Sequence, residues 1–189
     1  MPPKPPPSTN SVPYRIILFG PRGAGKRTNM KAIQQALAPA PSLSRPDGQS
    51  SAVAAEMPLE ANGTLIVPVV LQPVSASDGD TWAQTMRGLH GVIFVADSQP
   101  ERFDENVEAM ADLIGKLASL RIKIDNFPLV VQYNKRDVEG ATSITRLEES
   151  INPLGLPAFA AVAKDGIGAG ECFKALNLLI EKRSKELYS

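Results

Sequence analysis

Residues 20–28 read GPRGAGKRT, and this stretch decides how the rest of the chain is interpreted. Gly20, the next four residues, Gly25 and Lys26 match the pattern G-x-x-x-x-G-K-[ST], in which backbone N–H groups and a lysine surround phosphate oxygens. The apolar run at 14–19 (YRIILF) precedes the loop and is typical of a buried strand. The sequence therefore predicts a strand, a phosphate-binding loop (P-loop) and a helix in succession. The residues predicted to contact phosphate are Gly20, Arg22, Gly23, Ala24, Gly25, Lys26, Arg27 and Thr28.

One position in this loop departs from the pattern. The residue after Lys26 is normally Ser or Thr, because its hydroxyl holds the Mg²⁺ that bridges two nucleotide phosphates. Here that residue is Arg27. Thr28 follows, but one step along a helix turns a side chain by about 100°, so Thr28 is expected to point elsewhere. Two interpretations of Arg27 stay open: its guanidinium replaces the charge of the metal at a phosphate oxygen, or it is exposed and contacts no nucleotide.

Strands and helices are expected to alternate along the chain, which predicts the α/β class. The predicted domain is a single P-loop domain with a mainly parallel sheet and helices on both faces. Ligands of such sheets bind at the carboxyl ends of the strands, where the P-loop is expected. The expected strands are 14–19, 52–59, 64–71 (where Pro68 predicts an edge or a bulge), 92–96, 129–133 and 158–162. The expected helices contain Met30, Ile33 and Leu37; Trp82, Met86 and Leu89; residues 103–117; Ile144, Leu147 and Ile151; and Phe173, Leu176, Leu179 and Ile180.

The composition excludes several classes of protein. Lys+Arg and Asp+Glu are both 20 among 189 residues, so bulk charge does not favour nucleic-acid binding. No apolar run approaches the roughly 20 residues of a membrane span, and the single Cys172 excludes an internal disulfide. These features fit a cytoplasmic protein. The proline-rich residues 1–13 are expected to form a disordered tail or a ligand for an aromatic groove, and residues 14–189 the folded domain.

A second motif, NKRD, occupies residues 134–137 directly after an expected strand and matches the N-K-x-D pattern of guanine-nucleotide-binding proteins. The carboxylate of Asp137 would accept hydrogen bonds from N1–H and the 2-amino group of guanine, which adenine does not offer in that arrangement. Asn134 is expected to brace the loop, and the stem of Lys135 to cover the base. The motif therefore predicts a site selective for a guanine nucleotide, GTP or GDP.

A third motif, AVAK, occupies residues 161–164 after the last expected strand. It resembles the S-A-K loop of guanine-nucleotide-binding proteins, in which a backbone N–H reads guanine O6. Val162 takes the place of the serine, Ala163 would supply the N–H, and Lys164 would flank the base.

With these motifs the chain resembles the Ras-like small GTPases, and within them the bacterial MglA-type proteins of gliding motility and cell polarity. The resemblance implies a G domain that binds GTP or GDP, and it leaves open whether Mg²⁺ is bound. It also implies a Roadblock-fold regulator, which in the family is an activating protein, and effectors of the motility or polarity apparatus. The segments that carry the resemblance are GVIFVADSQPERFDENVEAM (91–110), VVQYNKRD (130–137), AVAKDGIG (161–168) and, apart from Arg27, the P-loop.

The resemblance fades where the family has its two nucleotide switches. The first normally has a Thr that contacts Mg²⁺ and an adjacent Arg. Here the segment 47–59 reads DGQSSAVAAEMPL, so Ser51 is the candidate switch residue and metal ligand, and Ser50 stands at the Arg position. The second switch normally contains a Gln that orients the attacking water. Here 71–80 reads LQPVSASDGD, in which Asp78-Gly79 or Asp80 are the candidate substitutes. Arg102 is expected to be a solvated helix residue rather than an arginine finger.

These departures predict a guanine-nucleotide-binding protein with slow or absent hydrolysis that works by recruiting partners. One alternative is an active GTPase in which Thr28 or Ser51 completes the metal site. Another is a scaffold that binds no nucleotide. A kinase or ATPase is disfavoured by Asp137, because that carboxylate matches guanine.

Overall fold

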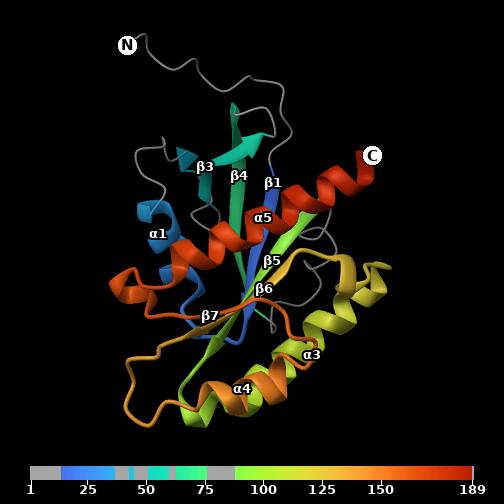
Figure 1. Ribbon diagram of the computed structural model, residues 1–189. Helices are drawn as coiled ribbons and strands as arrows, with labels where there is room; N and C mark the ends of the chain where they lie inside the picture. Colours follow the sequence, from blue (N-terminus) through green and yellow to red (C-terminus); the bar gives the residue numbers. More distant parts are fainter. Residues whose placement is uncertain (1–13, 37–42, 45–50, 60–62, 76–87, 189) are drawn as a thin grey trace.

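The computed structural model describes residues 14–36, 43–44, 51–59, 63–75 and 88–188. The strands of the described chain form one sheet in the order β2-β3-β4-β1-β5-β6-β7 (Figure 1). Strands β4, β1, β5, β6 and β7 are parallel, and β2 and β3 are antiparallel at one edge. The predicted α/β, mainly parallel sheet is thus confirmed. The strands are β1 Tyr14–Gly20, β2 Leu43–Ser44, β3 Ser51–Leu59, β4 Gly63–Ser75, β5 Leu89–Asp97, β6 Leu129–Asn134 and β7 Ala158–Ala160.

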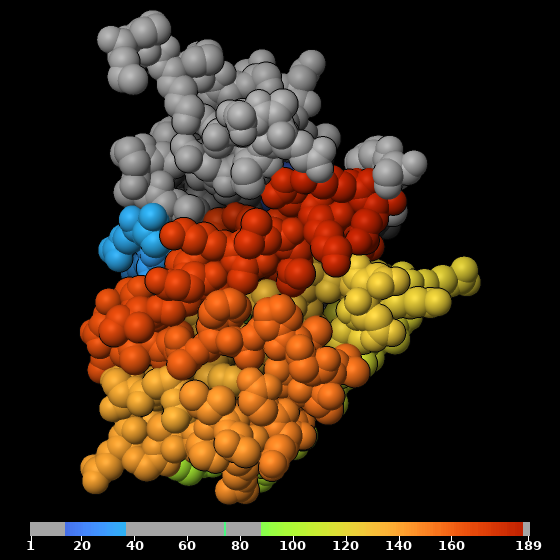
Figure 2. All heavy atoms as spheres, viewed as in Figure 1, coloured from blue at the N-terminus to red at the C-terminus, as the bar shows by residue number. Residues whose placement is uncertain are grey.

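Helices cover both faces of the sheet, as predicted. In β1, Ile16 and Leu18 pack in one apolar cluster with side chains of α1 and α5, whereas Ile17 and Phe19 pack in a second cluster with α3 and α4. Figure 1 shows α5 running across the strands on the first face, and Figure 2 shows it as a continuous band over the surface in view. Because β1 is buried on both faces, its apolar run is unbroken. The helices are α1 Lys26–Ala36, α3 Phe103–Ser119, α4 Ile144–Ile151 and α5 Ala169–Tyr188, with 3-10 turns η1 Pro100–Arg102, η2 Ile124–Asn126 and η3 Ala163–Asp165.

Strand β4 corrects the interpretation of Pro68. The strand is longer than predicted and lies inside the sheet, between β3 and β1, rather than at its edge. Pro68 pairs with Ala54 of β3, and Pro73 pairs with Leu18 of β1. Among the described residues, each of these two prolines therefore has a partner in one of the two neighbouring strands.

Three other expectations are wrong in detail. Leu89 begins β5 instead of belonging to a helix, and β4 continues through residues 72–75 beyond its expected end at 71. Ile144 shares the helical spacing of Leu147 and Ile151 but is 42% exposed, because it opens α4 next to its N-cap Ser143. The tail at 1–13, the helical positions Leu37, Trp82 and Met86, and the switch positions Ser50, Asp78, Gly79 and Asp80 lie outside the described residues.

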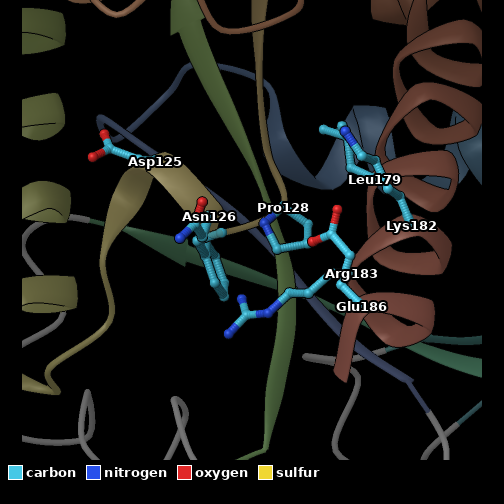
Figure 3. A pocket seen from close by; sticks show the side chains of 8 residues that line it. Asp125, Asn126, Pro128, Leu179, Lys182, Arg183 and Glu186 are labelled. Carbon is cyan, nitrogen blue, oxygen red and sulfur yellow. The ribbon is translucent and has the colours of Figure 1, made fainter. Parts of the chain in front are cut away.

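A hollow lies at the amino end of β6, opposite the P-loop. This hollow of about 150 Å³ lies between residues 125–128, just before β6, and the last turns of α5 (Figure 3). The Arg183 guanidinium lies 5.3 Å from the centre of the Phe127 ring at this place. The lining includes Asp125 and Glu186 as well as Lys182, so charges of both signs face it. Among the described residues, no helix is long and apolar enough to cross a membrane.

Candidate functional site

Three loops meet at the carboxyl ends of β1, β6 and β7, and one side chain joins them. The Asn134 side-chain amide donates to the Ala24 carbonyl of the P-loop at 2.8 Å. Its oxygen accepts from the backbone N–H of Ala163, which opens η3, at 3.0 Å. Asn134 is 3% exposed, so both bonds are shielded from water. The loops that the sequence predicts to bind phosphate and guanine are therefore held together by this amide.

The P-loop has the geometry of an anion cradle. Gly23 and Gly25 have φ of +84° and +93°, in the left-handed region that favours glycine. A Cβ at Gly25 would lie 2.4 Å from Asn134 Nδ2, so only glycine lets the two loops come this close. Lys26 is 7% exposed, and its ammonium donates to the carbonyls of Gly20 at 2.9 Å and Pro21 at 2.6 Å. The ammonium thus lies over the loop that would hold a phosphate.

The positions next to Lys26 do not offer a metal ligand of the usual kind. Arg27 occupies the position of the Ser or Thr hydroxyl, and a guanidinium has no lone pair to give to a cation. Arg27 and Thr28 are both exposed on the first turn of α1. Among the described residues, no group of three or more His, Cys, Asp or Glu side chains could hold a metal ion.

Ser51, the candidate switch residue, begins β3. Its Cα pairs with Leu71 of β4, which in turn pairs with Ile16 of β1. The Ser51 backbone is therefore level with the middle of β1, two strands away, and not with the P-loop at the end of β1.

On the base side, Asp137 and Lys164 form an ion pair, with the ammonium 2.5 Å from Asp137 Oδ2. The hydrogen bond from Lys164 lowers the pKa of Asp137, and the same bond raises the pKa of Lys164. Asp137 is thus a carboxylate at neutral pH, the form that accepts the two guanine N–H groups. Because Lys164 holds one of its oxygens, a bound base would share or replace that contact.

The backbone of the AVAK loop is close to the NKRD loop. Arg136 N–H donates to the Ala161 carbonyl at 3.1 Å, and Val162 pairs with Ile167 in an isolated bridge. The Ala163 N–H, predicted to read guanine O6, donates to Asn134 Oδ1. A base at this place would therefore take over or share the donor that Asn134 uses here.

The structure adds functional candidates that sequence reasoning missed. The Lys135 ammonium lies 2.6 Å from Asp97 Oδ2 and 2.8 Å from Gln99 Oε1, at the end of β5. Arg102 was expected to be solvated, but it is half-buried and its guanidinium donates to the Arg22 carbonyl of the P-loop. The available signal for Asp97 and Gln99 was the polar segment D-S-Q, which begins at the last residue of the buried strand β5, since polar residues there lie at the ligand edge of a parallel sheet.

The chain is similar to a curated bacterial protein along most of its length. No family model matches it. It is 27% identical to the mutual gliding-motility protein MglA of Myxococcus xanthus (strain DK1622) over an alignment of 190 positions, which covers 92% of this chain and 93% of MglA. The alignment spans both the P-loop and the base-side loops. The chain is therefore a distant homologue of MglA over most of the length of both proteins.

Proposed function

We propose that the chain binds GDP or GTP at the junction of the P-loop and the NKRD and AVAK loops, and recruits partners without appreciable hydrolysis. The Asn134 bridge carries the proposal, because it joins a phosphate loop to a base-reading loop with two buried hydrogen bonds. The similarity to MglA also supports the proposal, because MglA-type proteins are small GTPases and small GTPases bind guanine nucleotides.

Each loop has a separate part in holding the nucleotide. The backbone N–H groups around Gly23 and Gly25 and the Lys26 ammonium bind the phosphates. Asp137 accepts from the base, and the Lys135 stem covers it. Lys164 flanks the base from the other side.

Slow hydrolysis follows from what the chain lacks for phosphoryl transfer. Proteins catalyse this reaction almost entirely by positioning and charge stabilisation. Arg27 replaces the usual metal ligand, Ser50 stands at the position of the switch Arg, and residues 71–80 contain no Pro-Gly-Gln. Loss of an arginine finger alone lowers the rate by about 10³-fold or more. The exposed Arg27 guanidinium is placed one residue from the cradle and would pair with a phosphate oxygen in place of Mg²⁺.

The proposed partners are those that the resemblance to MglA-type proteins implies. We propose a cytoplasmic protein that meets a Roadblock-fold regulator and effectors of bacterial motility or polarity. An active GTPase, with Thr28 or Ser51 completing the metal site, and a scaffold without nucleotide are the competing functions.

Calorimetric titration with GDP and a non-hydrolysable GTP analogue, each in Mg²⁺ and in EDTA, tests the proposal. Micromolar or tighter binding of equal strength in both buffers is expected, because Arg27 supplies the charge of the metal. Binding that requires Mg²⁺ would favour the active GTPase, and no binding in either buffer would favour the scaffold. Arg27→Thr, which restores the usual ligand, is expected to make binding respond to Mg²⁺.

Substitution of Asp137 tests base recognition separately. Asp137→Asn exchanges the carboxylate for an amide, so preference is expected to move from GDP to xanthosine diphosphate by about 100-fold or more, as two charge-assisted bonds are lost. Asp125→Asn, an exposed aspartate in η2 at the opposite end of the sheet, is the matched control. Unchanged GDP preference in Asp137→Asn would contradict the assignment of the base site.

A further inference from the structure

Asp97 is a buried carboxylate at the ligand edge of the sheet that the proposed function does not use. It is the last residue of β5 and is 1% exposed. Asn106 of α3 fixes its backbone from both sides: Asp97 N–H donates to Asn106 Oδ1 at 2.8 Å, and Asn106 Nδ2 donates to the Asp97 carbonyl at 2.8 Å. The carboxylate is therefore held on a rigid support.

The side chain of Asp97 is directed at Lys135 of the NKRD loop. Asp97 Oδ2 lies 2.6 Å from the ammonium, and Asp97 Oδ1 accepts from Gln99 N–H at 3.1 Å. Gln99 supplies a second oxygen to the same ammonium, at 2.8 Å. The side-chain oxygens of Asp97 and Gln99 thus both contact the Lys135 ammonium.

The backbone conformation and the long side chain of Lys135 both need stabilising contacts. Its φ is +62°, a left-handed conformation that residues with a side chain rarely adopt. Strain of this kind persists where surrounding contacts over-determine the backbone. The Lys135 side chain is 29% exposed, so without an anchor its four-carbon stem would sample several rotamers in solvent.

We propose that Asp97 is a positioning residue, which holds the Lys135 ammonium so that the lysine stem lies ready over the base and slows release of the guanine nucleotide. The inference rests on the proposed function. Without Asp97 the bound state would have to order the stem each time, and the lost order would appear as faster dissociation. Association would change less, since the P-loop and Asp137 stay in place.

Release of N-methylanthraniloyl-GDP from the full chain, chased with unlabelled GDP, tests the inference. Asp97→Asn keeps the shape and removes the charge, and release is expected to accelerate by about tenfold, since a hydrogen bond between charged groups is replaced by a neutral one. Asp112→Asn is the matched control: it breaks another Asp–Lys pair, with Lys116 on α3, where the two charges are on a partly exposed helix face. Its release rate is expected to equal that of the unaltered protein.

A double-mutant cycle separates positioning from general damage. Lys135→Met keeps most of the stem and removes the ammonium. If Asp97 acts through that ammonium, Asp97→Asn has no further effect on release in the Lys135→Met background. Equal acceleration in both backgrounds, or unchanged release in Asp97→Asn alone, would overturn the inference.

The same assay covers two further cases, a variant that does not fold and a protein that does not retain GDP. If Asp97→Asn does not fold, Gln99→Ala tests the inference instead, because it removes one oxygen from the Lys135 ammonium and leaves the buried carboxylate of Asp97. It is expected to accelerate release about threefold, only when Lys135 is present, and an unchanged rate would overturn the inference. If the unaltered protein retains no labelled GDP, the proposed function itself fails, which is distinct from a protein that retains GDP equally with and without Asp97.

Discussion

The base-reading loops and the P-loop differ in how their polar side chains are held. On the base side, Asn134, Lys135, Asp137 and Lys164 each contact another group of the protein. In the P-loop, Lys26 is held by carbonyls, whereas Arg27 and Thr28 of the same turn are exposed. The proposed base site is thus held by contacts within the protein, whereas the two side chains that follow Lys26 are exposed. We therefore propose that recognition of a nucleotide and the chemistry on its phosphates are separable in this chain.

The largest expected effect comes from separating the two regions where they touch. Gly25→Ala places a Cβ 2.4 Å from Asn134 Nδ2 and keeps a left-handed φ of +93°. We expect the free energy of unfolding to fall by about 2–3 kcal/mol and GDP affinity to fall more than tenfold. The cost of alanine at a left-handed φ and the loss of the Asn134 bridge both contribute to these effects. Urea denaturation and calorimetric titration measure the two effects.

The control for this substitution is Gly115→Ala, in the interior of α3. A Cβ there has no heavy atom within 4 Å. The same change should raise the free energy of unfolding by about 0.5–1 kcal/mol, since alanine favours a helix over glycine. If both variants were equally stable, the close approach at Gly25 would not constrain the chain.

A smaller effect is expected where η1 contacts the P-loop. Arg102→Ala removes the bond to the Arg22 carbonyl, and we expect GDP affinity to fall about threefold to tenfold, because one charge-assisted bond that fixes the loop is lost. Glu105→Gln breaks the Arg102–Glu105 ion pair but leaves the contact with Arg22. Titration with GDP should show no loss in Glu105→Gln; a loss of equal size would assign the effect to the ion pair instead.

The smallest effect is expected at the opposite end of the sheet, far from both loops. Burial lowers the pKa of His90, and its Nδ1 accepts from Arg15 N–H at 3.1 Å. The unfolded chain takes up a proton near pH 6.5, so protonation favours unfolding, and stability present above that pH is lost as the pH falls below it.

Melting temperatures at pH 7.5 and 5.5 check this pH dependence. We expect the unaltered protein to lose about 2 °C more than His90→Gln, which keeps an acceptor that does not titrate. His90 is the single histidine of the chain, so few other groups titrate in this window. An identical loss in both proteins would place the pH dependence elsewhere.

Local sequence patterns predicted much of the fold and the three loops of the candidate site, but not the contacts that Asp97, Gln99 and Arg102 make with these loops. The run YRIILF, the P-loop and the following helical spacing predicted β1, the loop and α1, because burial on two faces and helical periodicity are properties of adjacent residues. NKRD and AVAK predicted which loops share an edge, since parallel strands end there. Pro68 misled because a proline is a local signal for a strand edge or a bulge, whereas the position of β4 between β3 and β1 depends on residues far along the chain.

Local sequence patterns predict the succession of the parallel strands and their helices, the three loops at one edge of the sheet and the departure at Arg27, but not the short strand β2. The folded chain adds that Asn134 reaches the Ala24 carbonyl 110 positions away, that Arg102 reaches a carbonyl 80 positions away and that Asp97 pairs with Lys135. The physical reason is separation along the chain. Hydrophobic periodicity and turn chemistry act between near neighbours, whereas these contacts exist because the packed sheet and helices bring distant backbone and side-chain groups within hydrogen-bond distance.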